Sequence, residues 1–244
     1  ADKYKVREYV QSLGLGDTLV KLYGRWDKAS DIDWDRLPNQ FVLKVNNGCG
    51  DILICRDKDK LDKATVIDTY DRLVSIKYGD VTGEPHYARI QPCVIAEELL
   101  DINKQSINTS SLIDYKVWCL NGKPYCIWCA WNRGKEGADT GVYDLDWNYH
   151  PEWSVFTEHY RQGKEILPKP KCFERMLEVA SKLSEEFPIL RVDLYEVNEK
   201  IYFGELTFTS LGGFMDYLTS EVLLDMGSKV RINEISEEYA HVKC

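Results

Sequence analysis

The sequence LRVDLY occupies residues 190–195, and the sequence GELT follows at residues 204–207. Both stretches alternate apolar and polar residues, which predicts two β-strands, each with one polar face. The residues between the strands favour a tight turn. A three-residue loop over residues 198–200 would pair Val197 with Ile201 across the resulting hairpin.

This register places Asp193 opposite Glu205 and Arg191 opposite Thr207, all on one face of the hairpin. Two facing carboxylates repel each other unless a cation lies between them. Mg²⁺ is commonly held by one or two carboxylates together with phosphate oxygens. The hairpin therefore predicts a phosphate-handling metal site, and a solvated polar face on an edge hairpin explains the same residues about equally well.

The composition limits the classes of function that this chain can have. Its 244 residues are enough for one large domain or two small lobes, and its net charge of -9 argues against binding a nucleic-acid backbone. Local lysines and arginines can still hold phosphates in an acidic protein. Without an apolar run of membrane-spanning length or a signal-peptide pattern, we expect a cytoplasmic protein with no membrane span.

Hydrophobic periodicity predicts a mixture of short strands and helices. Helices are expected over residues 2–13, 61–77, 173–186 and 219–227. Besides the two strands above, strands are expected over residues 41–45, 52–55, 94–96, 115–120 and 125–131. Residues 14–38 and 132–170 are expected to be loops or irregular. Because hairpins rather than helical crossovers connect the strands, we predict an α+β fold with mainly antiparallel sheets.

A polar stretch at residues 101–111 is a candidate hinge between two lobes. We therefore predict three parts along the chain. They are an N-terminal helix and loop segment at 1–38, a small lobe at 39–100 and a large lobe at 101–244 that carries the hairpin.

Two lysines on predicted strands are candidates for binding phosphate. Lys44 ends an apolar strand just before a loop that contains Gly48 and Gly50, and such a loop offers unhindered backbone N–H groups to an anion. Lys116 lies on a later strand. Taken alone, Lys44 and its loop are explained about as well by an ordinary hairpin turn. Taken alone, Lys116 is explained better by a solvent-facing position on an amphipathic strand.

The sequence EELL at residues 97–100 suggests a place for a nucleotide base. A base in an apolar slot needs an acceptor for its amine or for the ribose hydroxyls, which Glu97 or Glu98 can supply, and a backbone N–H, which Leu100 can supply. The simpler alternative is a strand that ends in a charged cap.

Taken in order, these segments resemble the ATP-grasp superfamily, and within it the TupA-like ATP-grasp family of bacterial surface-polysaccharide biosynthesis. The resemblance covers nearly the whole chain. It is carried by the motifs at residues 2–10, 37–44, 115–124, 143–147, 191–195 and 202–208.

The resemblance implies an ATP-grasp fold, in which two α+β lobes hold ATP between them. By position, Lys44 and Lys116 would contact phosphates, and the Gly48–Gly50 loop would close over them. Glu97 and the backbone around Leu100, with Glu98 beside them, would hold the adenosine.

The resemblance also implies roles for the hairpin. Asp193 and Glu205 would bind Mg²⁺, with Thr207 as a weaker ligand at a position where many ATP-grasp proteins have Asn. Arg191 would stabilise an acyl phosphate and the oxyanion that follows, with Lys116 as a second catalytic cation. The family reaction activates a carboxylate as an acyl phosphate, which an amine or another nucleophile then attacks.

The chain departs from its relatives in two places. Asn47 and Cys49 stand where relatives tend to have His and Ser, so the detailed contacts of the glycine loop are expected to differ from those of relatives. The chain also starts near a motif that follows a further N-terminal segment in relatives, so we expect a short version or a truncated piece.

The leading hypothesis is an ATP-dependent ligase that joins a uronic-acid sugar and an amino acid in capsule or related polysaccharide assembly. Its acceptor site is expected to draw on residues 132–165 and 208–216. A glycosyltransferase is one alternative, based on the Asp-x-Asp sequences at 31–33, 57–59 and 144–146. A glycan-binding protein is another, based on four tryptophans, for which core packing is the simpler explanation: Trp128, Trp131, Trp147 and Trp153.

Overall fold

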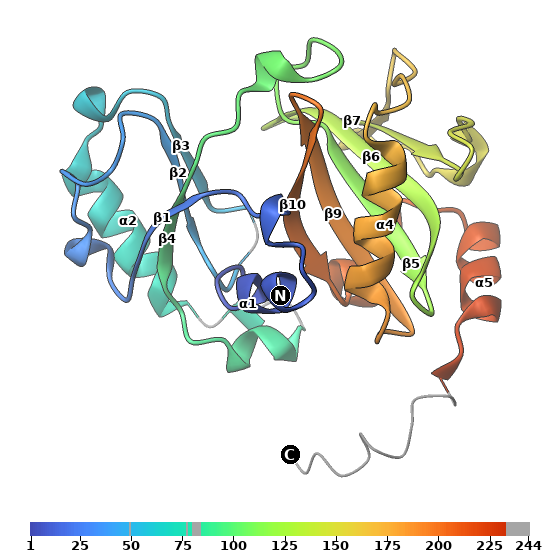
Figure 1. The fold of residues 1–244 in the computed structure, drawn as a ribbon, viewed down its shortest axis with the longest axis horizontal. Helices are drawn as coiled ribbons and strands as arrows, with labels where there is room; N and C mark the ends of the chain where they lie inside the picture. Colours follow the sequence, from blue (N-terminus) through green and yellow to red (C-terminus); the bar gives the residue numbers. More distant parts are fainter. Residues whose placement is uncertain (49, 77, 80–83, 233–244) are drawn as a thin grey trace. The chain divides into compact units, whose positions relative to one another are not determined.

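A computed structural model gives the fold of the chain (Figure 1). It describes residues 1–48, 50–76, 78–79 and 84–232. The chain divides into two compact units, Ala1–Asp101 and Ile102–Cys244, and each unit has a sheet of its own. Residues 1–38 belong to the first unit, and the finer division into three parts stays a prediction.

The first unit contains a four-stranded antiparallel sheet with the strand order β1-β4-β2-β3. Its strands are β1 (Leu22–Trp26), β2 (Phe41–Val45), β3 (Ile52–Cys55) and β4 (Val94–Glu97). Its α-helices with assigned bounds are α1 (Val6–Ser12) and α2 (Lys63–Ser75).

Alternation along β2 decides which side of this sheet is buried. Phe41, Leu43 and Val45 are buried in one apolar core with Val66 and Tyr70 of α2. The two residues between them point to the other face and are half-buried, as a period of two requires. The α2 face is therefore the core of this unit, and Lys44 lies on the opposite face.

The second unit contains a six-stranded sheet with the strand order β10-β9-β5-β6-β7-β8. Its strands are β5 (Asp114–Leu120), β6 (Lys123–Gly134), β7 (Gly137–Tyr143), β8 (Tyr160–Gln162), β9 (Ile189–Val197) and β10 (Lys200–Thr207). Its α-helices with assigned bounds are α4 (Phe173–Ser184) and α5 (Ser220–Lys229). All neighbouring strands are antiparallel except β7 and β8, so the prediction of mainly antiparallel sheets is confirmed.

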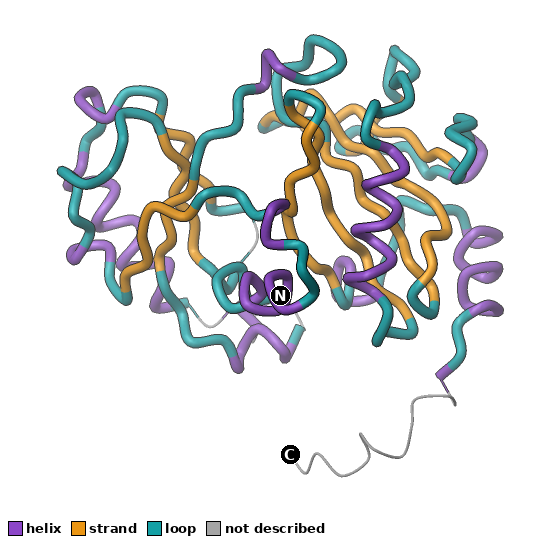
Figure 2. The backbone as a smooth tube through the Cα atoms, in the orientation of Figure 1, coloured by secondary structure: helices purple, strands orange, loops and turns teal. Residues whose placement is uncertain are grey.

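The helices α4 and α5 cover opposite faces of this sheet. Figure 2 shows α4 crossing the sheet, where it packs on β9, β5 and β6. Cys119 of β5 contacts Ala180 of α4, whereas its neighbour Trp118 packs with Val222 and Met226 of α5. Because successive side chains of a strand point to opposite faces, each helix buries one face of the sheet.

The four predicted helices are present, with ends that differ by a few residues. The first begins at Val6 rather than residue 2, and the predicted second helix, 61–77, is observed as Lys63–Ser75, with residue 77 outside the described residues. The helix α4 ends at Ser184, two residues earlier than predicted. End positions depend on local caps and vary most.

Three strands lie in regions predicted to be loops or irregular, so those predictions are wrong. β1 lies within residues 14–38, and β7 and β8 lie within residues 132–170. β1 contains one glycine and β7 contains two, and glycine lowers the strand signal in a sequence. Pairing with neighbouring strands, which sequence periodicity does not report, makes these segments strands.

The Asn-Gly pair between β5 and β6 forms the tight turn that the sequence indicates. Asn121 and Gly122 both have positive φ, at 50° and 75°. Two central residues with positive φ are typical of a type I′ turn, whose twist matches that of the flanking strands.

The β9–β10 hairpin corrects the predicted turn but keeps the predicted pairing. The loop has two residues, Asn198 and Glu199, both with positive φ, so Val197 pairs with Lys200 rather than with Ile201. A bulge between Phe203 and Glu205 then shifts the register by one residue. After the bulge, Asp193 lies opposite Glu205 and Arg191 opposite Thr207, as predicted.

Among the described residues, no helix is both long enough and apolar enough to cross a membrane.

The bulge at Gly204 gives a prediction about stability. A Cβ at Gly204 would lie 2.9 Å from the carbonyl oxygen of Asp193 and 3.0 Å from the ring of Tyr195. We expect Gly204→Ala to lower the free energy of unfolding by about 1–3 kcal/mol, because the backbone or Tyr195 must move. Urea unfolding of the purified variants measures this.

Gly227 of α5 is the matched control, because a Cβ there meets no atom within 4 Å. Gly227→Ala is expected to raise the free energy of unfolding by about 0.5–1 kcal/mol. Equal effects of the two substitutions would contradict a packing role for Gly204.

Candidate active site

The carboxylate of Asp193 lies at the centre of the polar face of β9 and is only 1% exposed. Arg191 donates to it twice, from Nε to Oδ1 over 2.7 Å and from Nη2 to Oδ2 over 2.9 Å. Lys116 Nζ also donates to Oδ2. The cations that a buried carboxylate requires are therefore the protein's own side chains.

These ion pairs set the charge states of the cluster. Burial raises the pKa of Asp193, but the charges of Arg191 and Lys116 outweigh burial and hold that pKa below its ordinary value. Burial lowers the pKa of Arg191, but Asp193 more than compensates, so that pKa lies well above its ordinary value. Asp193 and Arg191 are thus both charged at neutral pH.

Lys116 is buried because β5 pairs with β9 and places it directly opposite Asp193. The alternative of a solvent-facing lysine is therefore wrong. Its Nζ also donates to Asp114 Oδ2 over 2.6 Å. Within the described residues, two of the three ammonium hydrogens thus meet carboxylates, which leaves one for a ligand oxygen.

Asp114 and Arg133 extend this cluster, although sequence patterns did not single them out. Arg133 Nη2 donates to Asp114 Oδ2 over 2.5 Å, and Asp114 Oδ1 is buried with no hydrogen-bond partner in the described part of the chain. Asp114 has a usable signal, because it precedes Lys116 by two residues on one strand face. Arg133 has none, because an irregularity between Trp131 and Gly134 breaks the alternation of β6.

The hairpin residues lie together on the face of Asp193. Arg191 Nη2 donates to Thr207 Oγ1 over 3.0 Å and lies 3.8 Å from Glu205 Oε1. The side chain of Glu205 is 30% exposed, so it is the more accessible of the two facing carboxylates. Arg191 Nη1 donates to Ser210 Oγ over 2.8 Å. Ser210 lies in the range 208–216 that was expected to contribute to the acceptor site, but no sequence pattern indicates this residue in particular.

In the first unit, Glu97 joins two cations. Lys44 Nζ lies 2.7 Å from Glu97 Oε2, and Arg7 Nη1 lies 3.1 Å from Glu97 Oε1. The register of β2 and β4 explains the first contact, because Val42 lies opposite Glu97 and Lys44 is its diagonal neighbour on the same face. Arg7 comes from α1, so the N-terminal helix also holds the glutamate.

Some of the residues predicted to contact the base already have partners within the protein. The backbone N–H of Glu98 donates to the carbonyl of Lys21 over 2.9 Å, so it is already used. Leu100 is buried, and it follows the buried strand β4 by three residues. Glu97 accepts hydrogen bonds or ion pairs at both oxygens, so a ligand hydroxyl or amine would share it with Lys44 and Arg7.

The glycine loop is fixed where it leaves β2. The side chain of Asn46 donates to Asp2 Oδ1 and to the carbonyl of Gln91, both over 3.0 Å, and accepts from the Cys93 backbone N–H over 2.7 Å. Lys3 Nζ donates to the carbonyl of Gly48 over 2.5 Å. Asn46 thus ties the start of the loop to the N-terminal segment and to the chain before β4.

The far side of the glycine loop is only partly described. Gly50 has a φ of +88°, which a residue with a side chain rarely adopts. Asn47 Nδ2 donates to the carbonyl of Ile76 over 3.4 Å, and Cys49 lies outside the described residues.

The donor set on the hairpin fits Mg²⁺ only with help from a ligand. No group of three or more His, Cys, Asp or Glu residues within the described ranges is arranged to hold a metal. Asp193 is ionised but already accepts from Arg191 and Lys116, whereas Glu205 is partly exposed. Two carboxylates completed by phosphate oxygens and water are a usual Mg²⁺ environment, so phosphates would have to complete this one.

Comparison with known proteins identifies the class of this fold and then its family. The sequence profile described as TupA-like ATPgrasp matches residues 1–231, and the chain therefore belongs to the TupA-like ATP-grasp family. Both the predicted family and the predicted ATP-grasp fold of α+β type are confirmed. No protein with a curated description matches the chain in sequence.

The chain is similar to several solved structures, and the first one below shares its fold. D-alanine–D-alanine ligase from Bacillus anthracis is 15% identical, with a TM-score of 0.54, over 94% of this chain and 66% of that one. The same ligase from Helicobacter pylori is 13% identical, with a TM-score of 0.47, over 93% and 57%. N5-carboxyaminoimidazole ribonucleotide synthetase from Thermus thermophilus is 10% identical, with a TM-score of 0.47, over 84% and 44%. This chain therefore spans less than two thirds of each of these proteins.

Two of the Asp-x-Asp sequences have local structural roles. Asp57 accepts from the Asp59 backbone N–H over 3.2 Å, and Asp144 accepts from the Asp146 and Asn148 backbone N–H groups over 2.9 and 2.7 Å. These aspartates cap turns in the manner usual for their residue type.

The tryptophans considered for glycan binding differ in burial. Trp128 and Trp131 are buried in the sheet of the second unit. Trp147 and Trp153 are half-buried, and they stack on Tyr143 and His150, respectively. The first two therefore pack as core residues.

The buried ion pairs give a prediction about stability and pH. Asp193→Asn is expected to lower the free energy of unfolding at neutral pH by about 3–5 kcal/mol, because Lys116 and Arg191 lose their charged partner. The pKa of Asp193 is lowered by folding, so its contribution is present above the ordinary aspartate pKa of about 3.9 and is lost as the pH falls through the folded value. Urea unfolding at a series of pH values measures both effects.

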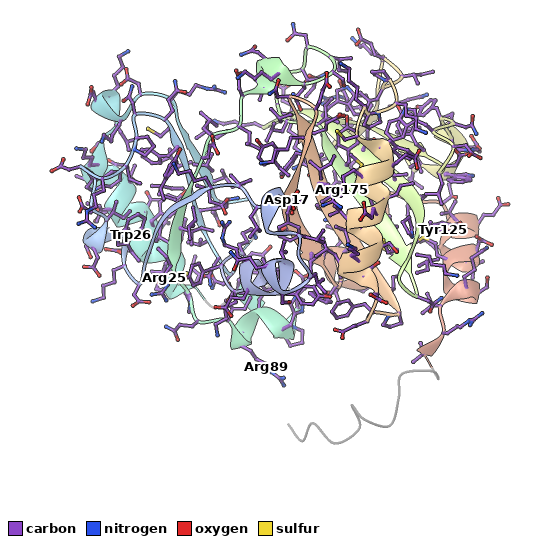
Figure 3. The ribbon with its side chains drawn as sticks, in the orientation of Figure 1. Asp17, Arg25, Trp26, Arg89, Tyr125 and Arg175 are labelled. Carbon is purple, nitrogen blue, oxygen red and sulfur yellow. The ribbon has the colours of Figure 1, made fainter. Side chains whose placement is uncertain are left out.

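Glu178→Gln is the matched control in the same unit. Glu178 pairs with Arg175 over 2.9 Å, and both side chains are exposed, so water screens the charges. Arg175 is labelled on α4 in Figure 3. The Glu178→Gln substitution is expected to change the free energy of unfolding little at any pH. A similar decrease in the free energy of unfolding in both variants would contradict a larger contribution from the buried Asp193 ion pairs than from an exposed pair.

Proposed function

We propose that this protein is an ATP- and Mg²⁺-dependent ligase that activates a carboxylate as an acyl phosphate for attack by an amine. The observation that carries the proposal is the buried cluster of Lys116, Asp193 and Arg191, which faces Glu205 in a chain of the ATP-grasp family. Buried charges are costly unless they are paired, and strongly shifted pKa values on one strand face are typical of functional sites.

In this proposal the second unit carries the chemistry. Lys116 donates its remaining ammonium hydrogen to a phosphate oxygen, and Arg191 stabilises the negative charge on the acyl phosphate and on the oxyanion that follows. Asp193, Glu205 and Thr207 hold Mg²⁺, which when bound neutralises charge on the phosphates. The side chains have to position and neutralise charge, which is most of what phosphoryl transfer needs from a protein.

The first unit supplies the proposed nucleotide contacts. Lys44 binds phosphate, and the loop that contains Gly48 and Gly50 offers it backbone N–H groups. Glu97 and Glu98, with the backbone at Leu100, hold the adenosine. The pairing of Lys44 with Glu97 supports this assignment, because it holds the lysine ammonium in place on the face of β2 opposite the core.

The proposed ligase acts on a uronic-acid sugar or an amino acid and forms an amide between the two kinds of molecule. The proposed setting is capsular or other surface-polysaccharide biosynthesis in the cytoplasm. Membership of the TupA-like family supports this context. The glycosyltransferase alternative is disfavoured, because two of its three Asp-x-Asp sequences already cap turns.

Calorimetric titration with ATP in excess Mg²⁺ tests the proposal. Lys116→Met is expected to weaken ATP binding by about ten- to a hundredfold, the usual loss for a hydrogen bond to a charged group. Lys123→Met, which changes an exposed lysine of the neighbouring strand, is expected to bind ATP as the wild type does.

Glu205→Gln tests the metal role without breaking the Asp193 ion pairs. It is expected to remove most of the difference between ATP binding in Mg²⁺ and in a chelator, and the double substitution of Asp193 and Glu205 by Ala is expected to remove all of it. Absence of ATP binding by the intact protein would refute the proposed function.

A further inference from the structure

The loop that follows β10 has an unusual backbone. Leu211 has φ 51° and ψ 39°, and Gly212 and Gly213 also have positive φ, at 64° and 96°. A left-handed conformation is costly for leucine, and such strain persists only where surrounding contacts enforce it. The same short turn buries Ser210 and leaves Phe214 83% exposed.

Ser210 and Tyr217 fasten this loop to Arg191. Arg191 Nη1 donates to Ser210 Oγ over 2.8 Å, and Ser210 Oγ shares a second hydrogen bond with the hydroxyl of Tyr217 over 2.9 Å. Ser210 and Tyr217 are both buried. Ser210 at the start of the loop and Tyr217 after it are therefore linked through one hydroxyl, which is bound to Nη1 of Arg191.

The contacts of Arg191 are unequal in strength. Nε and Nη2 donate to the ionised carboxylate of Asp193, and such charge-assisted bonds are about twice as strong as those to neutral groups. Nη1 meets the neutral hydroxyl of Ser210, carried by a loop whose outer side chains Leu211 and Phe214 are exposed. A ligand oxygen can therefore replace the partner of Nη1 with a smaller loss of hydrogen-bond energy than the partner of Nε or Nη2.

We propose that Ser210 and Tyr217 are positioning residues that hold Arg191 Nη1 in place until a substrate oxygen replaces Ser210 as its partner. This inference rests on the proposed function, in which Arg191 stabilises charge on the substrate. A substrate that enters beside the loop displaces Ser210 and receives the Nη1 hydrogen bond. The two Asp193 bonds keep the guanidinium plane aligned during the exchange.

A labelling experiment tests the hydroxyl contacts without any catalytic assay. Phenylglyoxal modifies accessible guanidinium groups, and peptide mass spectrometry follows Arg191 separately from Arg133, whose side chain is 45% exposed and serves as an internal reference. Relative to Arg133, labelling of Arg191 is expected to be at least about threefold faster in Ser210→Ala and in Tyr217→Phe than in the wild type.

Two variants keep this experiment interpretable. Tyr125→Phe removes a tyrosine hydroxyl that donates to Asp225 of α5 instead (Figure 3), and it is expected to label at the wild-type rate. Ser210→Thr keeps a hydroxyl and is expected to restore slow labelling. Wild-type labelling of Arg191 in a folded Ser210→Ala protein would overturn the inference.

Kinetics then separate positioning from a merely structural role. With Mg²⁺-ATP and a substrate found by ADP release, Ser210→Ala is expected to lower kcat by about ten- to a hundredfold and leave the Kd for ATP unchanged, and Ser210→Thr is expected to recover most of the rate. Unchanged kcat, or a loss of ATP binding equal to the loss of kcat, would contradict the inference. If the wild type bound no ATP, the proposed function would be refuted. The labelling result would still test the contact between Ser210 and Arg191.

Discussion

The Asp193 carboxylate is buried between the guanidinium of Arg191 and the ammonium of Lys116, and the polar cluster of the second unit depends on this arrangement. A buried carboxylate is tolerated only when charges and hydrogen bonds compensate it. Three strands supply the partners: β9 carries the arginine, β5 the lysine, and β10 the facing Glu205. Pairing of these strands is therefore a condition for the cluster, and the cluster in turn favours that pairing.

The cluster is balanced in charge, which suggests how a ligand would enter it. Lys116, Arg191 and Arg133 supply three positive charges, and Asp193, Asp114 and Glu205 can supply three negative ones. A lone anion or a lone cation would leave a buried charge uncompensated, whereas a metal–nucleotide pair brings both signs together. On the proposed function, a ligand takes the Nη1 end of Arg191, which meets the neutral hydroxyl of Ser210, and the remaining ammonium hydrogen of Lys116.

The pairing of Asp193 with Glu205 was predictable from sequence alternation, yet the predicted turn was wrong. A two-residue turn and a bulge beside Gly204 each shift the register by one residue, and together they restore the predicted pairing. The bulge depends on backbone approach that a lone glycine does not reveal. Burial of Lys116 was also not predictable, because it depends on strand order. Asp114 was within reach of the sequence, whereas Arg133 and Ser210 come from irregular backbone that periodicity does not describe.

The most direct test of the central claim is a crystal structure of the protein with a non-hydrolysable ATP analogue and Mg²⁺. We expect a metal about 2.0–2.1 Å from oxygens of Asp193 and Glu205, with Lys116 Nζ in hydrogen-bond contact with a phosphate oxygen. A nucleotide and metal bound elsewhere, with the ion pairs of Asp193 unchanged, would contradict it.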